Sequence, residues 1–272
     1  MNSRIQSFIE AAGWPRIIIG LFLVSLFVAA PFVGVRIDTS LSDTLVRVGM
    51  NGVMVLALVP MVQSGCGLNF GLPLGIIAGL VGAVTSIEMN VLGMMGFFVA
   101  LLISVPLAVL LGYGYGLLLN RVKGDEMMIA TYVGFSSVAV MCMAWLLLPY
   151  KSPTMIWGYG GAGLRTTISV EGFWLHILSD FLHVQIGKFF YFPTGMFLFF
   201  ALMCFLMWGF LHTKTGTAMT AVGSNPEFAR ASGINVDRMR IVSVVLSTVL
   251  GAVGILVYQQ SFGFIQLYMG PF

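Results

Sequence analysis

The sequence predicts an all-α polytopic membrane protein with about seven to eight transmembrane helices. Two observations carry this prediction. Of the 272 residues, 58% are hydrophobic and 8% are charged, and the mean hydropathy is +0.99, whereas a soluble globular domain carries about 25% charged residues. In addition, the apolar residues gather in runs close to the roughly 20 residues that cross a bilayer. The lipid bilayer is therefore a partner, and a net charge of only +3 argues against nucleic acid.

The apolar runs give the expected spans in chain order. They cover residues 17–33, 45–66, 72–89, 91–119, 127–148, 192–211 and 241–259. The first run is too long for the core of a signal peptide and lacks a cleavage site, so we expect it to be retained. The tail, residues 260–272, is compatible with the start of a further element. We expect residues 1–272 to form a single transmembrane domain.

The positions of Lys and Arg predict the orientation of the spans. With the N-terminus inside, eight basic residues lie on the inner side and five on the outer side. This places residues 212–240 in the cytoplasm and residues 150–191 outside. If the third run were re-entrant, every later loop would change side and the bias would point the wrong way, so a full crossing is favoured.

The outer stretch contains a pattern typical of an interfacial amphipathic helix. The apolar face would hold Trp174, Ile177, Leu178, Phe181 and Leu182, and the opposite face His176, Ser179, Asp180 and His183. Two histidines and an aspartate at helical spacing could bind a metal, but a wetted polar face is the favoured interpretation, so no metal is expected. Such a helix would either cover the mouth of a pathway or present a docking surface.

A glycine-rich stretch, QSGCGLNFGLPLG at residues 63–75, predicts a break between two spans. Broken backbone at membrane depth is tolerated where it is buried or lines a cavity, so this stretch is a candidate for lining a pathway. A tight turn at the inner surface is the equally favoured alternative. The candidate pathway residues are Asn51, Gln63, Gly65, Gly67, Asn69 and Gly71.

Neutral amides outnumber charges inside the spans. Asn51, Gln63, Asn69, Asn90, Gln259 and Gln260 would suit an uncharged polar solute if they faced a cavity, and could equally bond a neighbouring helix. Ionisable residues are nearly absent there, which gives little support to a proton relay.

A polar island at residues 216–240 separates the last two long apolar runs and predicts a short capped helix. Asn225 is a good N-cap, Pro226 suits the first helical position, and Glu227 complements the helix dipole. Gly233 can take the left-handed conformation that ends a helix, and Ile234 can fold back onto the helix. A helix of about two turns is marginal alone, so it must be held by what flanks it or docks on it.

Several chemistries have no motif in this sequence. It contains no phosphate-binding GxxxxGK[ST] loop, no HExxH zinc motif and no GxSxG nucleophile elbow. Cys66, Cys142 and Cys204 stand alone in apolar segments and imply neither a disulfide nor a metal site. We therefore expect no enzyme activity and no cofactor. A transporter without an ion relay or a nucleotide site needs an external motor.

The island GTAMTAVGSNPEFARASGINVDR resembles the cytoplasmic signature of permease subunits of bacterial ABC importers for ribose, simple sugars, nucleosides and branched-chain amino acids. The stretch SGCGLNFGLPLG resembles the glycine-rich segment that follows the second span in the same family, and NRVKGDEMMIATYVGFS resembles its next cytoplasmic turn and helix. The strongest matches are Gly216, Ala221, Gly223, Asn225, Ala229, Gly233 and Ile234.

The resemblance implies a type II importer-like permease domain in the bacterial cytoplasmic membrane. It would pair with a second permease subunit, bind ATP-hydrolysing subunits at its cytoplasmic loop and receive solute from an extracytoplasmic substrate-binding protein. The residues that would couple to the ATPase are Gly216, Ala221, Gly223, Asn225, Pro226, Glu227, Ala229, Arg230, Gly233 and Ile234.

Two features depart from the family pattern. Sugar permeases of this family often carry an Asp in the glycine-rich stretch, where this chain has Leu68 and Asn69. The chain also stops at Phe272, where such permeases continue through further spans, so either the C-terminal part is missing or the match is partial.

The expected function is uptake of a small polar nutrient, a simple sugar or nucleoside first and a branched-chain amino acid second. A secondary transporter or channel without an ATPase is the alternative from another class, and a membrane scaffold is a third.

Overall fold

The computed structural model describes residues 13–67, 69–122, 124–156, 163–186 and 190–268. Contacts between Cα atoms divide the chain into two units, residues 1–45 with 184–192, and residues 46–183 with 193–272. Helix α3 (Ile37–Leu56) contributes to both.

The first unit joins an apolar helix to a short hairpin. Helix α2 (Trp14–Ala29) continues into the 3-10 turn η1 (Ala30–Val33), and Gly34, at φ +80°, ends this turn before α3. Strands β2 (Val184–Ile186) and β3 (Phe190–Phe192) pair antiparallel. Ser42 of α3 binds β3, because its hydroxyl donates to the Tyr191 carbonyl over 2.6 Å and accepts from the Tyr191 amide.

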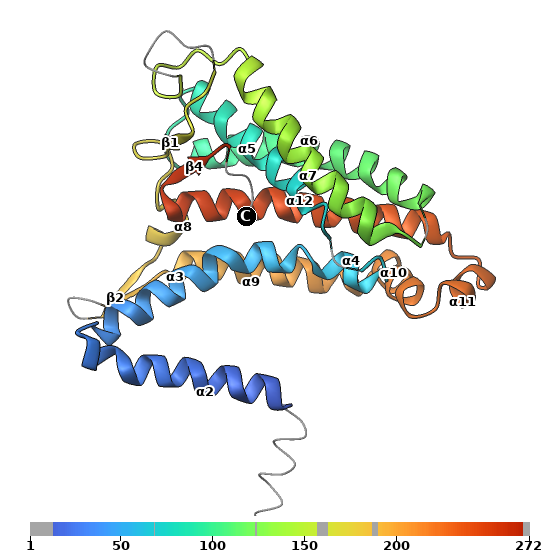
Figure 1. Cartoon of the computed structure of the whole chain (residues 1–272), viewed down its shortest axis with the longest axis horizontal. Helices are drawn as coiled ribbons and strands as arrows, with labels where there is room; N and C mark the ends of the chain where they lie inside the picture. The colour runs from blue at the N-terminus through green and yellow to red at the C-terminus, as the bar shows by residue number, and fades with distance from the viewer. Residues whose placement is uncertain (1–12, 68, 123, 157–162, 187–189, 269–272) are drawn as a thin grey trace, which may run out of the picture. The chain divides into compact units, whose positions relative to one another are not determined.

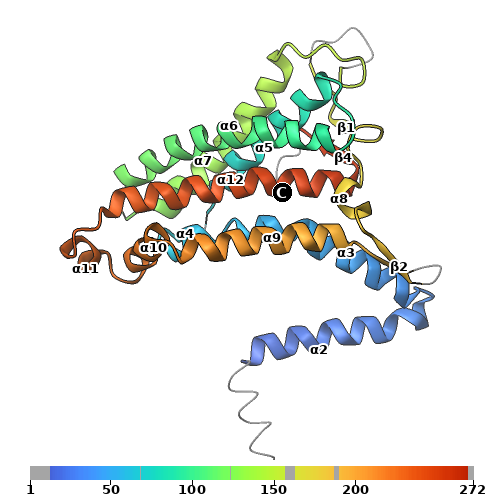
Figure 2. The same ribbon diagram turned by 180° about the vertical axis from the view of Figure 1, so that it is seen from behind.

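The second unit is a helical bundle (Figures 1 and 2). Besides the end of α3 it contains α4 (Val59–Gln63), α5 (Leu72–Glu88), α6 (Gly93–Arg121), α7 (Glu126–Leu147), α8 (Ile177–Asp180), α9 (Thr194–Leu211), α10 (Lys214–Ser224), α11 (Pro226–Ala231) and α12 (Val236–Phe262). Strands β1 (Thr167–Ser169) and β4 (Phe264–Gln266) pair antiparallel at one end of α12, and α11 lies at the other end (Figure 1).

Helix α5 packs against both α6 and α12, which also pack directly against each other, and these three helices form the centre of the bundle. The glycines of α5 permit this close packing. A side chain at Gly75 would meet the Thr248 carbonyl of α12, one at Gly79 would meet Ile255 of α12, and one at Gly82 would meet Ser104 of α6. Lipid tails are as apolar as the side chains, so the hydrophobic effect does not drive membrane helices together. Close packing does so instead, and small residues permit it.

The all-α polytopic fold is confirmed. Within the described part of the chain, six helices are long and apolar enough to cross a membrane: Trp14–Val33, Ile37–Gln63, Gly93–Arg121, Glu126–Leu147, Thr194–Leu211 and Val236–Phe262. The remaining expected span, residues 72–89, forms α5, which has 17 residues. At about 1.5 Å per residue, this helix is close to the thickness of the hydrocarbon layer.

The predicted amphipathic helix around residues 174–183 is wrong in extent, and its faces are correct only in part: Trp174 and Leu178 are buried and His176, Asp180 and His183 are exposed, as predicted. Helix covers only Ile177–Asp180, between left-handed residues at His176 (φ +53°) and Leu182 (φ +52°). Ser179, expected to be wetted, is buried, and Leu182, expected to be covered, is 66% exposed. The cause is tertiary: the Gln260 carbonyl accepts the His176 amide over 2.8 Å, so α12 takes hydrogen bonds that a longer helix would have made itself.

The tail also forms an element, as expected, but it is a strand. Helix α12 runs on to Phe262, and Gly263, in the left-handed conformation at φ +86°, ends it. The following residues form β4, whose Ile265 pairs with Ile168 of β1. Residues 269–272 of the expected tail lie outside the described residues.

Candidate functional site

Helix α11 is capped at both ends by the residues that the sequence predicted. The side-chain Oδ1 of Asn225 accepts the Phe228 amide over 3.0 Å, and Pro226 occupies the first helical position. At the other end Gly233 has φ +82°, its amide donates to the Arg230 carbonyl, and the Ile234 amide donates back to the Ala229 carbonyl. This pair of hydrogen bonds closes the helix end in the left-handed motif that favours glycine.

The helix is anchored through one buried residue. Ala229 is fully buried and packs with Val222 of α10 and Val236 of α12, with Ile234 and Met239 partly buried around them. This cluster holds the six-residue helix against the two longer helices that flank it, which supplies the support that so short a helix needs. Among the predicted coupling residues, Ala229 and Ile234 therefore pack α11 in place.

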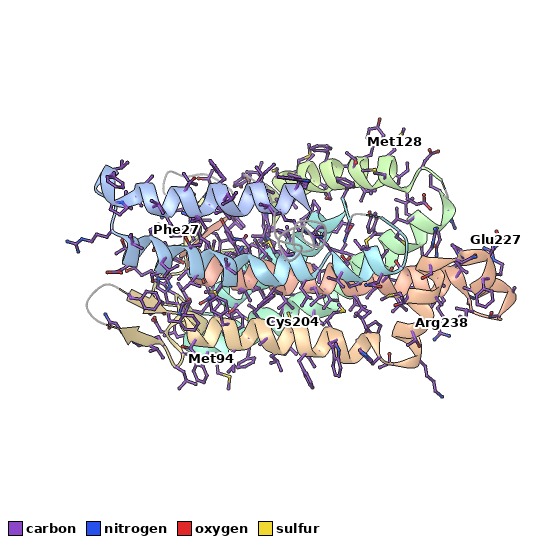
Figure 3. All side chains as sticks on the ribbon, turned by 90° about the horizontal axis from the view of Figure 1, so that it is seen from below. Phe27, Met94, Met128, Cys204, Glu227 and Arg238 are labelled. Atoms are coloured by element: carbon purple, nitrogen blue, oxygen red, sulfur yellow. The ribbon has the colours of Figure 1, made fainter. Side chains whose placement is uncertain are left out.

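The opposite face of α11 is open. Pro226, Glu227 and Arg230 are exposed, and Figure 3 shows Glu227 at the tip of the bundle, at the same end as Arg238. Phe228, between Glu227 and Arg230 in α11, is 68% exposed. Sequence reasoning missed Phe228 as a surface residue; an aromatic inside a capped polar helix was the available signal. An exposed aromatic on a rigid element is the kind of residue that anchors a protein interface.

Helix α10 joins this face to the transmembrane part. Thr213 caps α10 by accepting the Gly216 amide, and a side chain at Gly216 would collide with the Phe210 carbonyl, so glycine permits the tight turn from α9. At the other end the Ala221 carbonyl accepts the amide of Asn225, which is also the N-cap of α11. The chain therefore passes from α10 into α11 through a single residue.

The glycine-rich break packs directly on α10. A side chain at Gly65 (φ +72°) would bring its Cβ within 3.0 Å of the Gly223 Cα, and one at Gly223 would collide with the Gln63 carbonyl. The structure thus brings the break at 63–75 and the island at 216–240 into backbone contact, which spacing in the sequence did not predict. We call this contact the Gly65–Gly223 contact.

The break itself, between α4 and α5, is confirmed. Asn69 is buried in it and donates to Ser247 Oγ over 2.6 Å, while Ser64 Oγ donates to Ser243 Oγ over 2.7 Å. The amide nitrogen of Asn69 therefore bonds a neighbouring helix, one of the two roles that the sequence left open, while its buried Oδ1 has no hydrogen-bond partner among the described residues.

The remaining glycines of the break differ from one another. Gly71 is a close-approach position, because a Cβ there would reach within 2.7 Å of the Tyr115 hydroxyl. Gly67 is left-handed (φ +82°) with open space around its Cα. Leu68 lies outside the described residues.

Asn51, the predicted pathway residue outside the glycine-rich stretch, lies on α3 and lines a cavity that Leu72 of that stretch also lines. The Nδ2 of Asn51 donates to the Arg47 carbonyl one turn earlier in α3, and the cavity, of about 220 Å³, is also lined by Gln259 and Gln266. A larger groove, between α6 and α12, is lined mainly by aliphatic side chains. Among the described residues, the 220 Å³ cavity is where the predicted amides Asn51 and Gln259 meet.

Comparison with known protein families identifies the family of this chain. The sequence model of one family, described as branched-chain amino acid transport system / permease component, matches residues 40–272. No curated protein and no solved structure gives a significant match. The matched range contains the break, α10, α11 and α12. The chain therefore belongs to the branched-chain amino acid transport system permease family, the multi-pass membrane components of ABC transporters.

Proposed function

We propose that this chain is the transmembrane subunit of an ATP-driven importer for a small polar nutrient, and that α11 is the element through which an ATPase subunit moves it. The observation that carries the proposal is α11 itself: a helix capped by Asn225 and Gly233, anchored by Ala229 and exposing Phe228. A capped and anchored helix can transmit a displacement, whereas a flexible loop would absorb it.

The Gly65–Gly223 contact gives this displacement a route into the membrane. A movement of α11 is passed to α10, since the two helices share Asn225 as cap. The end of α10 touches the break before α5 through backbone atoms, with no side chain between them to yield. Because α5 packs against both α6 and α12, a shift at the break acts on the centre of the bundle.

The proposed partners follow from this arrangement and from the family. Permeases of ABC transporters work with ATPase and substrate-binding proteins. We place ATP-binding subunits at α11 on the cytoplasmic side, a substrate-binding protein on the outer side, and a second permease subunit, identical or different, beside the bundle. ATP hydrolysis then belongs to the partner, and the chain itself is not an enzyme.

The proposed solute is a simple sugar or a nucleoside, with a branched-chain amino acid as the alternative within the same family. The first choice is supported by the neutral amides that meet at the 220 Å³ cavity, because amide groups pair hydroxyls without the cost of a buried charge. The family description favours the alternative, since it names amino acids.

Co-purification tests the proposal. The tagged full-length chain, extracted from its own membranes in mild detergent, is expected to bring an ATP-binding subunit with it. Phe228→Ala should reduce this recovery at least tenfold, because one well-placed interface aromatic contributes about 2 kcal/mol or more to docking. Phe135→Ala is the matched control: Phe135 of α7 is equally exposed, at 67%, but lies outside the coupling segment.

The outcomes separate the proposal from a transporter without a motor. Loss of the ATPase subunit in Phe228→Ala, with full recovery in Phe135→Ala, would support docking at α11. Solute uptake that needs no ATP, by a chain from which no ATPase subunit is recovered, would instead identify a secondary transporter or channel.

A further inference from the structure

The 220 Å³ cavity is lined by Tyr258, Gln259 and Phe262, close to the end of α12 that leads into β4. Helix α11 lies at the other end of α12 (Figure 1). Helices α3, α5 and α12 and strand β4 line the cavity. In the predicted orientation the β4 end of α12 faces outward, where a substrate-binding protein would deliver solute. We propose that this cavity is a binding site for one neutral, hydroxylated sugar ring, either a free monosaccharide or the ribose of a nucleoside. This inference rests on the proposed function and names the substrate class and the site.

The first argument is an unpartnered buried amide. Gln259 is 2% exposed, and its Oε1 has no hydrogen-bond partner among the described residues. A buried polar atom without a partner is costly to the folded protein, so such atoms in native structures call for an explanation. Because Gln259 lines the cavity, a hydroxyl donor bound there would supply the missing partner.

The neighbouring residue, Gln260, shows that a buried glutamine at this end of α12 can find hydrogen-bond partners. Gln260 is also fully buried, yet its Oε1 accepts the Leu178 amide over 3.2 Å and its Nε2 donates to Ser261 Oγ over 2.7 Å. Gln260 therefore holds the segment of α8 against α12. Gln259, one residue earlier on the same helix, faces the cavity with an acceptor unused.

The second argument is the chemistry of the remaining lining. Asn51 and Gln266 add two further amides, which both donate and accept and so match hydroxyl groups. Tyr258 and Phe262 stack with ring centroids 5.5 Å apart, and Phe264 meets Phe262 edge-on at 6.4 Å. Aromatic faces of this kind offer a broad apolar surface to the C–H face of a sugar ring or to a base.

Size and charge narrow the ligand class. A volume of 220 Å³ equals about seven waters at about 30 Å³ each, and lies below the roughly 300–1,000 Å³ of sites for drug-sized ligands. It therefore suits one ring. Among the described residues that line the cavity, none carries a carboxylate, ammonium or guanidinium group. A zwitterionic amino acid would bury two charges there without partners, which is strongly unfavourable.

The test is a titration of the purified complex of this chain with its ATP-binding subunits, without the substrate-binding protein. D-ribose, uridine and L-leucine are added separately, and the unfolding temperature of the chain reports binding. We expect ribose, uridine or both to raise it, with ribose alone indicating a free sugar and uridine alone a nucleoside. In Gln259→Leu the dissociation constant should rise about tenfold, the effect of one lost hydrogen bond.

The control is Gln260→Leu. Because Gln260 is fully hydrogen-bonded, its replacement should lower the unfolding temperature of the ligand-free complex, whereas Gln259→Leu should leave it unchanged or raise it. The inference would be overturned if leucine alone stabilised the chain or if none of the three ligands did. It would also be overturned if Gln259→Leu bound ribose and uridine as tightly as the wild type does. Each of these can occur in a complex whose ATPase docks normally, so the proposed function is judged separately, by recovery of the ATPase.

Discussion

At the scale of single residues, two kinds of glycine occur in this chain. Gly114 of α6 and Gly209 of α9 have open space where a side chain would be, whereas Gly65 and Gly223 meet each other's backbone. The letters alone do not distinguish them, because the contact joins parts of the chain far apart in sequence. Gly223 matches the family signature in the sequence, but the close contact that requires glycine at this position is visible only in the fold.

Gly223→Ala is expected to impair transport. Its methyl group would collide with the Gln63 carbonyl, so α10 and the break must separate, at a cost of about 1–3 kcal/mol. Uptake per ATP hydrolysed should fall, with the protein still inserted. Gly114→Ala, in open space within α6, should be neutral or stabilise by about 0.5–1 kcal/mol. Normal coupling in Gly223→Ala would show that this contact does not transmit movement.

At the scale of elements, signals contained within a few residues were reliable. The caps of α11 were predicted correctly because Asn225, Pro226 and Gly233 act on backbone groups of their own helix. The segment around α8 was predicted wrongly because its pattern of apolar residues was helical, yet hydrogen bonds to Gln260 of α12 decide its conformation. The spacing of apolar residues indicates which residues prefer burial, but it does not indicate which other element of the fold will bury or bond them.

The Gly233 cap gives a prediction about α11 as a unit. Gly233→Val forces a β-branched residue into φ +82°, at a cost of about 1 kcal/mol or more that comes from the backbone alone, because a Cβ there has no neighbour within 4 Å. ATP-driven uptake should fall while membrane insertion persists. Gly233→Asn is the matched control, since Asn tolerates the left-handed conformation. Equal uptake by the Val and Asn variants would count against a rigid α11.

At the scale of the whole molecule, composition was sufficient for the fold class but not for the candidate sites. The apolar runs predicted the long helices, including α12, whose expected bounds at 241–259 fall inside Val236–Phe262. The cavity could not be predicted, because Asn51 and Gln259 come from helices at opposite ends of the sequence. The sequence identified the amides of Asn51, Gln259 and Asn69 alike as candidates. The structure shows that Asn51 and Gln259 line the cavity, whereas Asn69 does not and donates to Ser247.

The central claim is that α11 faces the cytoplasm and receives the work of an ATPase. The most direct measurement places a photoreactive amino acid at position 228 in cells and identifies what it crosslinks. Phe228 is exposed, so the probe should not disturb the packing of Ala229 beneath it. The account predicts one dominant crosslink, to an ATP-binding subunit, and no such crosslink from position 135. Crosslinks from position 228 only to lipid or to proteins outside the cell would contradict it.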